Sequence, residues 1–199
     1  MYSLYHSTGA CSLATLTILN ELAIPVTVVN VNSIPDFNVI NPVACVPALA
    51  IDTQVLTEGA AIVLYLLNKH ENNLLPTEPQ ARQQAIEHIM FANATMHPAY
   101  SKLFFINQHI SNEDAKQQAL DAAAAHINKL WQVVENKLNE QHYLGGNEPS
   151  AADIMLAVYS GWGAYFPVTI HFGESTTKML LETRSRSSFR MALASDEAK

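Results

Sequence analysis

Cys11 is the residue of this sequence that could act most directly as a nucleophile. It follows a predicted strand and a Gly9-Ala10 turn, so we expect it in the first turn of a helix. Free backbone N–H groups and the positive end of the helix dipole favour an anion there, which predicts a lowered thiol pKa and thiolate at neutral pH. The alternative interpretation is a small buried residue with no chemical role.

From residue types and spacing alone, no second cysteine, metal site or histidine is singled out as a partner for Cys11. No cysteine follows it in Cys11-Ser-Leu-Ala14, so a self-resolving dithiol is excluded and a monothiol would need an outside thiol. Nothing near Cys45 indicates activation, and we interpret it as a packing residue. The eight histidines contain no His-x-x-x-His pair, so no metal site is predicted. His97 alone would be an ordinary helical residue.

Two further segments could bind an extended, anionic ligand. Val46-Pro47 opens a predicted strand, where we expect either a cis peptide bond or an ordinary strand-start proline. In the cis form, the backbone of Val46 would be an edge to which a peptide could pair. Glu58 is either a first-turn acid or part of a site in which the amides of Gly59 and Ala60 bind a carboxylate.

The elements that position these residues form a first domain, predicted over residues 1–73. Alternating or β-branched runs predict strands, and apolar residues at helical spacing predict helices. The expected order is a strand over 2–6, a helix over 11–22, a strand over 26–31, a hairpin over 47–51 and 54–56, and a helix over 58–69. The first two strands should be parallel, with a right-handed crossover.

Residues 74–79 contain two prolines and no periodicity, and we interpret them as a linker. The following residues, 80–199, are predicted to be all-helical. One long pattern covers residues 80–108, and Pro98 is expected to kink it because proline removes a helix hydrogen bond. Another amphipathic pattern covers residues 112–141.

A buried helix is predicted to begin at Ser150. Ser150-Ala-Ala-Asp153 is a variant capping box ahead of an apolar run. In such a box the hydroxyl caps the helix start, and the acid three residues later accepts from the cap residue's backbone.

Composition excludes several classes of protein. The 199 residues are 49% hydrophobic and 15% charged, which is far from the composition of a disordered chain. The net charge of −7 lacks the basic footprint of a nucleic-acid-binding protein. Neither a transmembrane run nor a secretory signal is recognised, and two cysteines fit a reducing cytoplasm.

Several motifs, taken together, are similar to those of the glutathione S-transferases, specifically the bacterial beta class. They are Gly9-Ala-Cys-Ser-Leu13, Asn41-Pro42 with Val46-Pro-Ala-Leu49, Leu56-Thr-Glu-Gly-Ala-Ala-Ile-Val63, Ser150-Ala-Ala-Asp153, and His97 with Tyr100, Ser101, Leu103 and Phe104. They occur in the family's order and spacing, and they span nearly the whole chain.

The resemblance implies a glutathione S-transferase fold: an α/β thioredoxin-like N-terminal domain and an all-α C-terminal domain. It also implies a homodimer that uses glutathione as co-substrate and needs no metal. Val46 would pair its backbone with the cysteinyl unit beside cis-Pro47, while Glu58 and Gly59 would hold the γ-glutamyl end. Cys11 matches the class cysteine that can form a mixed disulfide with glutathione.

The helical domain would supply the remaining site residues. By resemblance, His97 matches the histidine that reaches the glutathione site, and Trp162 falls where the class has a site tryptophan. The expected walls of an apolar substrate pocket are Tyr100, Phe104, Tyr165 and Phe166. The implied reactions are conjugation of glutathione to an apolar electrophile, or thiol-disulfide exchange through Cys11.

The sequence departs from the class at three places where a polar contact to glutathione would be expected. Pro98 replaces the lysine that often follows the site histidine, Met90 replaces an asparagine, and the loop over 31–41 has no lysine. These differences favour an alternative, a non-catalytic module of the same fold that binds apolar ligands or a protein partner. An isomerase of unsaturated diacids fits less well, since no basic group is recognised for a second carboxylate.

Overall fold

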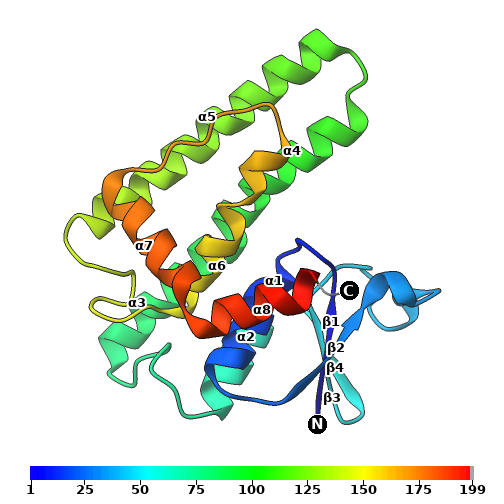
Figure 1. Cartoon of the computed structure of the whole chain (residues 1–199), viewed down its shortest axis with the longest axis vertical. Coiled ribbons are helices and arrows are strands. Elements are labelled where there is room, and N and C mark those ends of the chain that lie inside the picture. The colour runs from blue at the N-terminus through cyan, green and yellow to red at the C-terminus, as the bar shows by residue number, and fades with distance from the viewer. Residues whose placement is uncertain (198–199) are drawn as a thin grey trace. The chain divides into compact units, whose positions relative to one another are not determined.

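The computed structural model describes residues 1–197, which divide into two compact units (Figure 1). The first unit consists of Met1–Leu75 together with the C-terminal segment from Arg184 onward, and the second is Pro76–Thr183. Along residues 1–197, no helix combines the length and the apolar character needed to cross a membrane.

The first unit is built on a four-stranded sheet with the order β2-β1-β3-β4. Its strands are β1 (Tyr2–His6), β2 (Val26–Asn30), β3 (Ala48–Ile51) and β4 (Gln54–Leu56). β1 and β2 run parallel, as the predicted βαβ unit requires, and the β3–β4 hairpin is antiparallel. Alternate residues of β1 are buried, because successive side chains of a strand point to opposite faces.

Helices α1 (Ser12–Glu21) and α2 (Gly59–Lys69) pack against each other and against β1 and β3. Apolar side chains such as Leu19 and Ile62 are fully buried there. Two short 3-10 turns, η1 (Val31–Ser33) and η2 (Phe37–Val39), lead from β2 toward β3. The predicted elements of this unit are therefore confirmed, with bounds that shift by a residue or two.

Helix α8 (Ser187–Glu197) packs on α1, in the first unit. The sequence placed these residues in the helical domain, so the unit boundary differs from the prediction. Phe189 and Ala192 lie three residues apart, as on one helical face, and both are buried. Periodicity shows that a helix has an apolar face but does not show which neighbour covers that face.

In the second unit, the predicted helix over residues 80–108 is three successive segments. These are α3 (Pro79–Met90), the π-helical η3 (Phe91–Met96) and α4 (His97–His109). The interruption precedes Pro98 rather than occurring at it. Because Pro98 has no N–H and its ring crowds the preceding turn, the wider π turn accommodates it within a continuous helical path.

The rest of the second unit is helical apart from connecting segments. Its elements are α5 (Glu113–Leu138), α6 (Ala151–Tyr159), the short η4 (Trp162–Tyr165) and α7 (Glu174–Ser185). Every residue of α6 is buried, which makes it the central helix of this unit. Trp131 of α5 is 1% exposed, and its indole Nε1–H donates to the Tyr100 hydroxyl at 2.8 Å.

The predicted capping box at α6 is confirmed by a buried hydrogen-bond network. Asp153 Oδ2 accepts from the Ser150 backbone N–H at 2.7 Å and from the Ser150 hydroxyl at 2.7 Å. Asp153 Oδ1 accepts from the Leu144 N–H at 2.9 Å. Burial raises the pKa of Asp153, and these donors oppose that effect. The carboxylate thus links the start of α6 to the preceding loop.

Replacing Asp153 with alanine is expected to lower the free energy of unfolding by about 2–6 kcal/mol. The reason is that two buried N–H groups lose their acceptor, at about 1–3 kcal/mol each. Urea unfolding followed by circular dichroism measures the loss. Asp121→Ala, at an exposed position of α5, is the control and should change stability by about 0.5 kcal/mol or less. A similar effect of both substitutions would contradict this account.

Candidate functional site

The turn between β1 and α1 places Cys11 at the helix start, as predicted. Ala10 N–H donates to the Ser7 carbonyl at 3.1 Å, and Gly9 has a φ of 72°, a conformation that glycine adopts without strain. Cys11 is the N-cap residue of α1, and its thiol donates to the Val46 carbonyl at 3.2 Å. The cysteine and the loop before β3 therefore meet directly.

The ionisation of Cys11 differs from the prediction. Burial raises the pKa of the Cys11 thiol to about 11, and the backbone N–H groups of Cys11 and Ser12 lower it by less. The prediction of thiolate at neutral pH is therefore wrong for this protein without a ligand. The N–H groups at the helix start lower the pKa as expected, but desolvation of the half-buried sulfur outweighs their effect. At neutral pH, Cys11 is a thiol that can donate a hydrogen bond.

The loop before β3 carries the predicted cis peptide bond between Val46 and Pro47. Asn41, 4% exposed, holds this loop: its amide Nδ2 donates to the Cys45 carbonyl at 2.7 Å and its Oδ1 accepts from Val43 N–H at 3.2 Å. Sequence reasoning gave Asn41 no role, although an asparagine before proline is a turn signal. The interpretation of Cys45 as a packing residue is wrong, because its side chain is exposed.

The start of α2 is the third part of this region. Glu58 is its N-cap residue, with φ 66° and ψ 112° and no capping hydrogen bond from its side chain. A non-glycine residue in the left-handed region stores about 1–3 kcal/mol and is typical of functional sites. The Glu58 side chain is exposed, and Gly59 begins the helix.

Strand register brings these three segments to one edge of the sheet. Tyr5 of β1 pairs with Ala48 of β3, and Leu49 pairs with Leu56 of β4. The end of β1, the start of β3 and the end of β4 therefore share an edge, and they lead to Cys11, Val46 and Glu58 respectively. This edge of the sheet combines the Cys11 thiol, the backbone of Val46 and the N-terminus of α2. These three groups are suited to bind a thiol-containing peptide that carries a carboxylate.

The second unit contains an aromatic cluster around His97. The His97 ring lies edge-on to Tyr159 and to Trp162, each at 5.2 Å between centroids, and Tyr159 stacks on Trp162 at 4.7 Å. Burial lowers the pKa of His97, so the neutral imidazole is favoured at pH 7. The structure thus brings two predicted site residues together, and it adds Tyr159, which sequence reasoning missed within a uniformly apolar helix.

The predicted pocket walls separate into core and surface. Tyr100 is fully buried, and it belongs to the core through its contact with Trp131. Phe104 packs on Phe166 at 4.8 Å and on Tyr165 at 6.2 Å, and it is 42% exposed. Phe104 and Tyr165 therefore present an apolar surface next to the His97 cluster. Within residues 1–197, no cluster of three or more acidic, histidine or cysteine side chains could hold a metal.

Family models match both parts of the chain. One described as "Glutathione S-transferase, N-terminal domain" matches residues 10–74, and one described as "Glutathione S-transferase, C-terminal domain" matches residues 92–176. The chain belongs to the glutathione S-transferase family. Both the predicted resemblance and the predicted glutathione S-transferase fold are confirmed.

Similar glutathione S-transferases include several bacterial proteins. The protein GST-4.5 of Xanthomonas campestris pv. campestris is 31% identical over 165 residues, covering 80% of this chain and 81% of its own. A sphingomonad glutathione S-transferase solved with glutathione is 28% identical, with a TM-score of 0.86 over 99% of this chain and all of its own. The beta-class enzyme of Sphingomonas chungbukensis is 27% identical, with a TM-score of 0.84 over 98% of each chain.

Titration of Cys11 tests the ionisation of this glutathione S-transferase. In a Cys45→Ala protein without glutathione, thiolate absorbance in the ultraviolet is expected to rise only well above the pH at which an ordinary thiol titrates, since burial is the largest cause of the raised Cys11 pKa. A Cys11→Ala, Cys45→Ala protein supplies the tyrosine background. A Cys11-dependent transition below the ordinary thiol value of about 8.5 would contradict the structure.

Proposed function

We propose that this protein binds glutathione at the edge formed by Cys11, Val46 and Glu58 and transfers it to an apolar electrophile. The observation that carries the proposal is the 3.2 Å hydrogen bond from the Cys11 thiol to the Val46 carbonyl. It places a thiol donor beside the backbone edge to which a peptide can pair. Membership of the family, and a relative solved with glutathione, support the choice of ligand.

Two of the three units of the tripeptide, the cysteinyl unit and the γ-glutamyl end, have a matching group on this edge. The backbone of Val46, before cis-Pro47, would pair with the cysteinyl unit as an added strand does. At the other segment, the Gly59 N–H and the positive end of α2 would bind the γ-glutamyl carboxylate. The exposed Glu58 carboxylate would pair with the γ-glutamyl ammonium group.

Conjugation is the reaction that a protonated Cys11 supports best. When glutathione binds, the Cys11 S–H would leave the Val46 carbonyl and donate to the glutathione sulfur instead. This hydrogen bond would stabilise the glutathione thiolate, which is then free to attack the electrophile. The proton of the glutathione thiol passes to solvent, the sulfur forms the new bond to the electrophile, and the leaving group departs with the electron pair of the broken bond. We propose that the surface of Phe104 and Tyr165, beside His97 and Trp162, binds the apolar part of the electrophile.

Thiol-disulfide exchange is the second proposed reaction. Cys11 would lose its proton and attack the mixed disulfide between glutathione and a substrate thiol. This step forms a Cys11–glutathione disulfide and releases the substrate thiol. A second glutathione would then attack that disulfide, restore Cys11 and leave as glutathione disulfide. Because the pKa of Cys11 is about 11, little thiolate exists at neutral pH, so this reaction should accelerate as pH rises.

A non-catalytic binding module is the alternative function. Met90 and Pro98 lack the polar groups expected at their positions, and their absence would weaken glutathione binding. Calorimetric titration with glutathione, followed by conjugation assays with a chloronitrobenzene, separates the two functions. Glutathione binding with turnover supports the transferase, whereas binding of apolar ligands without turnover supports the module. We further propose a cytoplasmic homodimer, which sedimentation analysis tests.

Substitutions of Cys11 are expected to separate the two reactions. Cys11→Ala should lower kcat/KM for conjugation by about 10–100-fold, because a hydrogen bond to a charged sulfur contributes about 1.5–3 kcal/mol. Cys11→Ser keeps a donor, so conjugation should largely persist. Both variants should abolish thiol-disulfide exchange. Cys45→Ala is the matched control and should change neither rate. Full conjugation by Cys11→Ala would contradict the proposed role.

Glu58→Gln is expected to raise the KM for glutathione by about tenfold with little change in kcat. The reason is that this substitution removes a charge-assisted contact to the ammonium group, which is the same in the ground and transition states. Steady-state kinetics with varied glutathione measure the effect. Glu71→Gln, at another exposed acid of the first unit, is the control. An equal change in both variants would indicate general electrostatics rather than a binding contact.

A further inference from the structure

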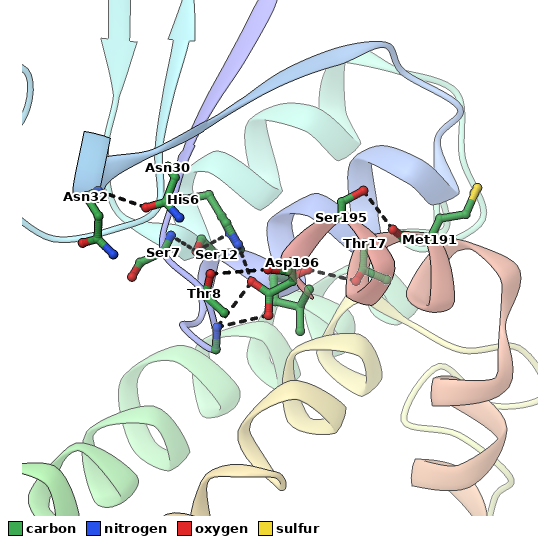
Figure 2. Close-up of polar contacts among 12 residues, drawn as sticks. His6, Ser7, Thr8, Ser12, Thr17, Asn30, Asn32, Met191, Ser195 and Asp196 are labelled. Carbon is green, nitrogen blue, oxygen red and sulfur yellow. Dashed lines mark hydrogen bonds and ion pairs between the residues drawn. The ribbon is translucent and has the colours of Figure 1, made fainter. Parts of the chain in front are cut away.

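A chain of buried hydrogen bonds joins the C-terminal helix to the turn that carries Cys11 (Figure 2). Asp196 Oδ1 lies 2.6 Å from His6 Nε2, and His6 Nδ1 lies 2.8 Å from the Ser12 hydroxyl. The Ser7 backbone N–H donates to the same hydroxyl at 3.3 Å. His6 and Ser12 are fully buried, and Asp196 is 6% exposed.

The donors and acceptors of this chain have one consistent direction. A carboxylate can only accept, so His6 donates from Nε2 to Asp196. In the neutral imidazole, His6 Nδ1 then accepts from the Ser12 hydroxyl, whose oxygen accepts from Ser7 N–H. The chain has the composition of a serine, histidine and aspartate triad, but Ser12 is 0% exposed and no substrate can reach it. Any effect of this hydrogen-bond chain on Cys11 must therefore act through the backbone of the turn between β1 and α1.

Asp196 also holds the turn directly. Both of its carboxylate oxygens accept from the Gly9 N–H, at 3.1 and 3.3 Å. The Thr8 hydroxyl donates to the Asp196 backbone carbonyl at 3.4 Å. The network therefore has two arms. One is the contact of the Asp196 carboxylate with Gly9, two residues before Cys11. The other runs from Asp196 through His6 to Ser12, the residue directly after Cys11.

We propose that Asp196 is a positioning residue for Cys11, acting through Gly9 on one side and through His6 and Ser12 on the other. The proposal rests on the proposed function of Cys11. With both arms in place, the turn holds the thiol against the Val46 carbonyl. When they are lost, the turn is free to move the sulfur out of its half-buried position. A displacement of about 1 Å at a reacting group can reduce rate by about 10²-fold.

The same helix is anchored a second time, away from the turn. Arg186 Nε donates to Glu21 Oε2 at 3.3 Å, and the Ser188 hydroxyl also donates to this carboxylate. Asn20 Nδ2 donates to the Ser188 carbonyl at 3.1 Å. Glu21 therefore holds the start of α8 to the end of α1. Loosening this anchor weakens the packing of α8 without touching the Cys11 turn.

The test compares Asp196→Asn with Glu21→Gln, each in a Cys45→Ala protein so that Cys11 is the only thiol. An asparagine offers one acceptor oxygen where the carboxylate uses two. In Asp196→Asn, Cys11 alkylation by iodoacetamide should be about tenfold faster, because a less buried thiol ionises more readily. The kcat for conjugation should fall about tenfold, with the KM for glutathione changed less than about threefold.

Glu21→Gln should lower the melting temperature while leaving alkylation and kcat unchanged. Asp196→Glu should restore part of the kcat, because it keeps both acceptor oxygens. If Asp196→Asn does not fold, His6→Gln, which keeps the Asp196 contact to Gly9, is measured in its place and should accelerate alkylation. Equal acceleration in the Asp196 and Glu21 variants, or no acceleration in either, would overturn the proposal. If the parent protein lacks transferase activity, the proposed function fails, and alkylation still decides the role of Asp196.

Discussion

The hydrogen bond from the Cys11 thiol to the Val46 carbonyl is the interaction on which the candidate site depends. It joins the start of α1 to the loop before β3, two segments that the strand register already brings to one edge. It also holds the sulfur in a partly desolvated position. Burial raises the pKa of this thiol from 9.0 to about 11, which corresponds to about 3 kcal/mol against the thiolate. A helix dipole supplies only about 0.3–1 kcal/mol, so desolvation prevails.

Local structure was predictable from the sequence because it depends on nearby residues. Alternation in Tyr2–His6, the Asp52-Thr53 turn and the box from Ser150 to Asp153 each fix a short element by short-range physics. The edge that gathers Cys11, Val46 and Glu58 followed from those elements. The resemblance to the family then assigned a ligand that no local pattern could identify.

The properties that sequence reasoning missed depend on contacts between distant segments. The pKa of Cys11 is set by burial, which no helix position reveals. Asp196 meets His6 across 190 positions of the chain, and no pattern in either segment indicates the other. Cys45 is exposed, in a loop whose backbone is held by a hydrogen bond from the Asn41 amide to the Cys45 carbonyl. Such facts require the packed structure.

The π-helical segment Phe91–Met96 separates α3 from α4 along one helical path and shifts the positions of the side chains around the helix axis between the two. Each residue of an α-helix turns the chain by roughly 100°, so the extra residue of a π turn rotates everything after it by about that angle. Residues of α3 and α4 that would share one face of a continuous α-helix therefore lie on different faces. A single-residue deletion in this segment would restore uniform winding and turn His97 and Phe104 away from Trp162. Insertions and deletions here, rather than substitutions, are the changes that would redirect the aromatic face.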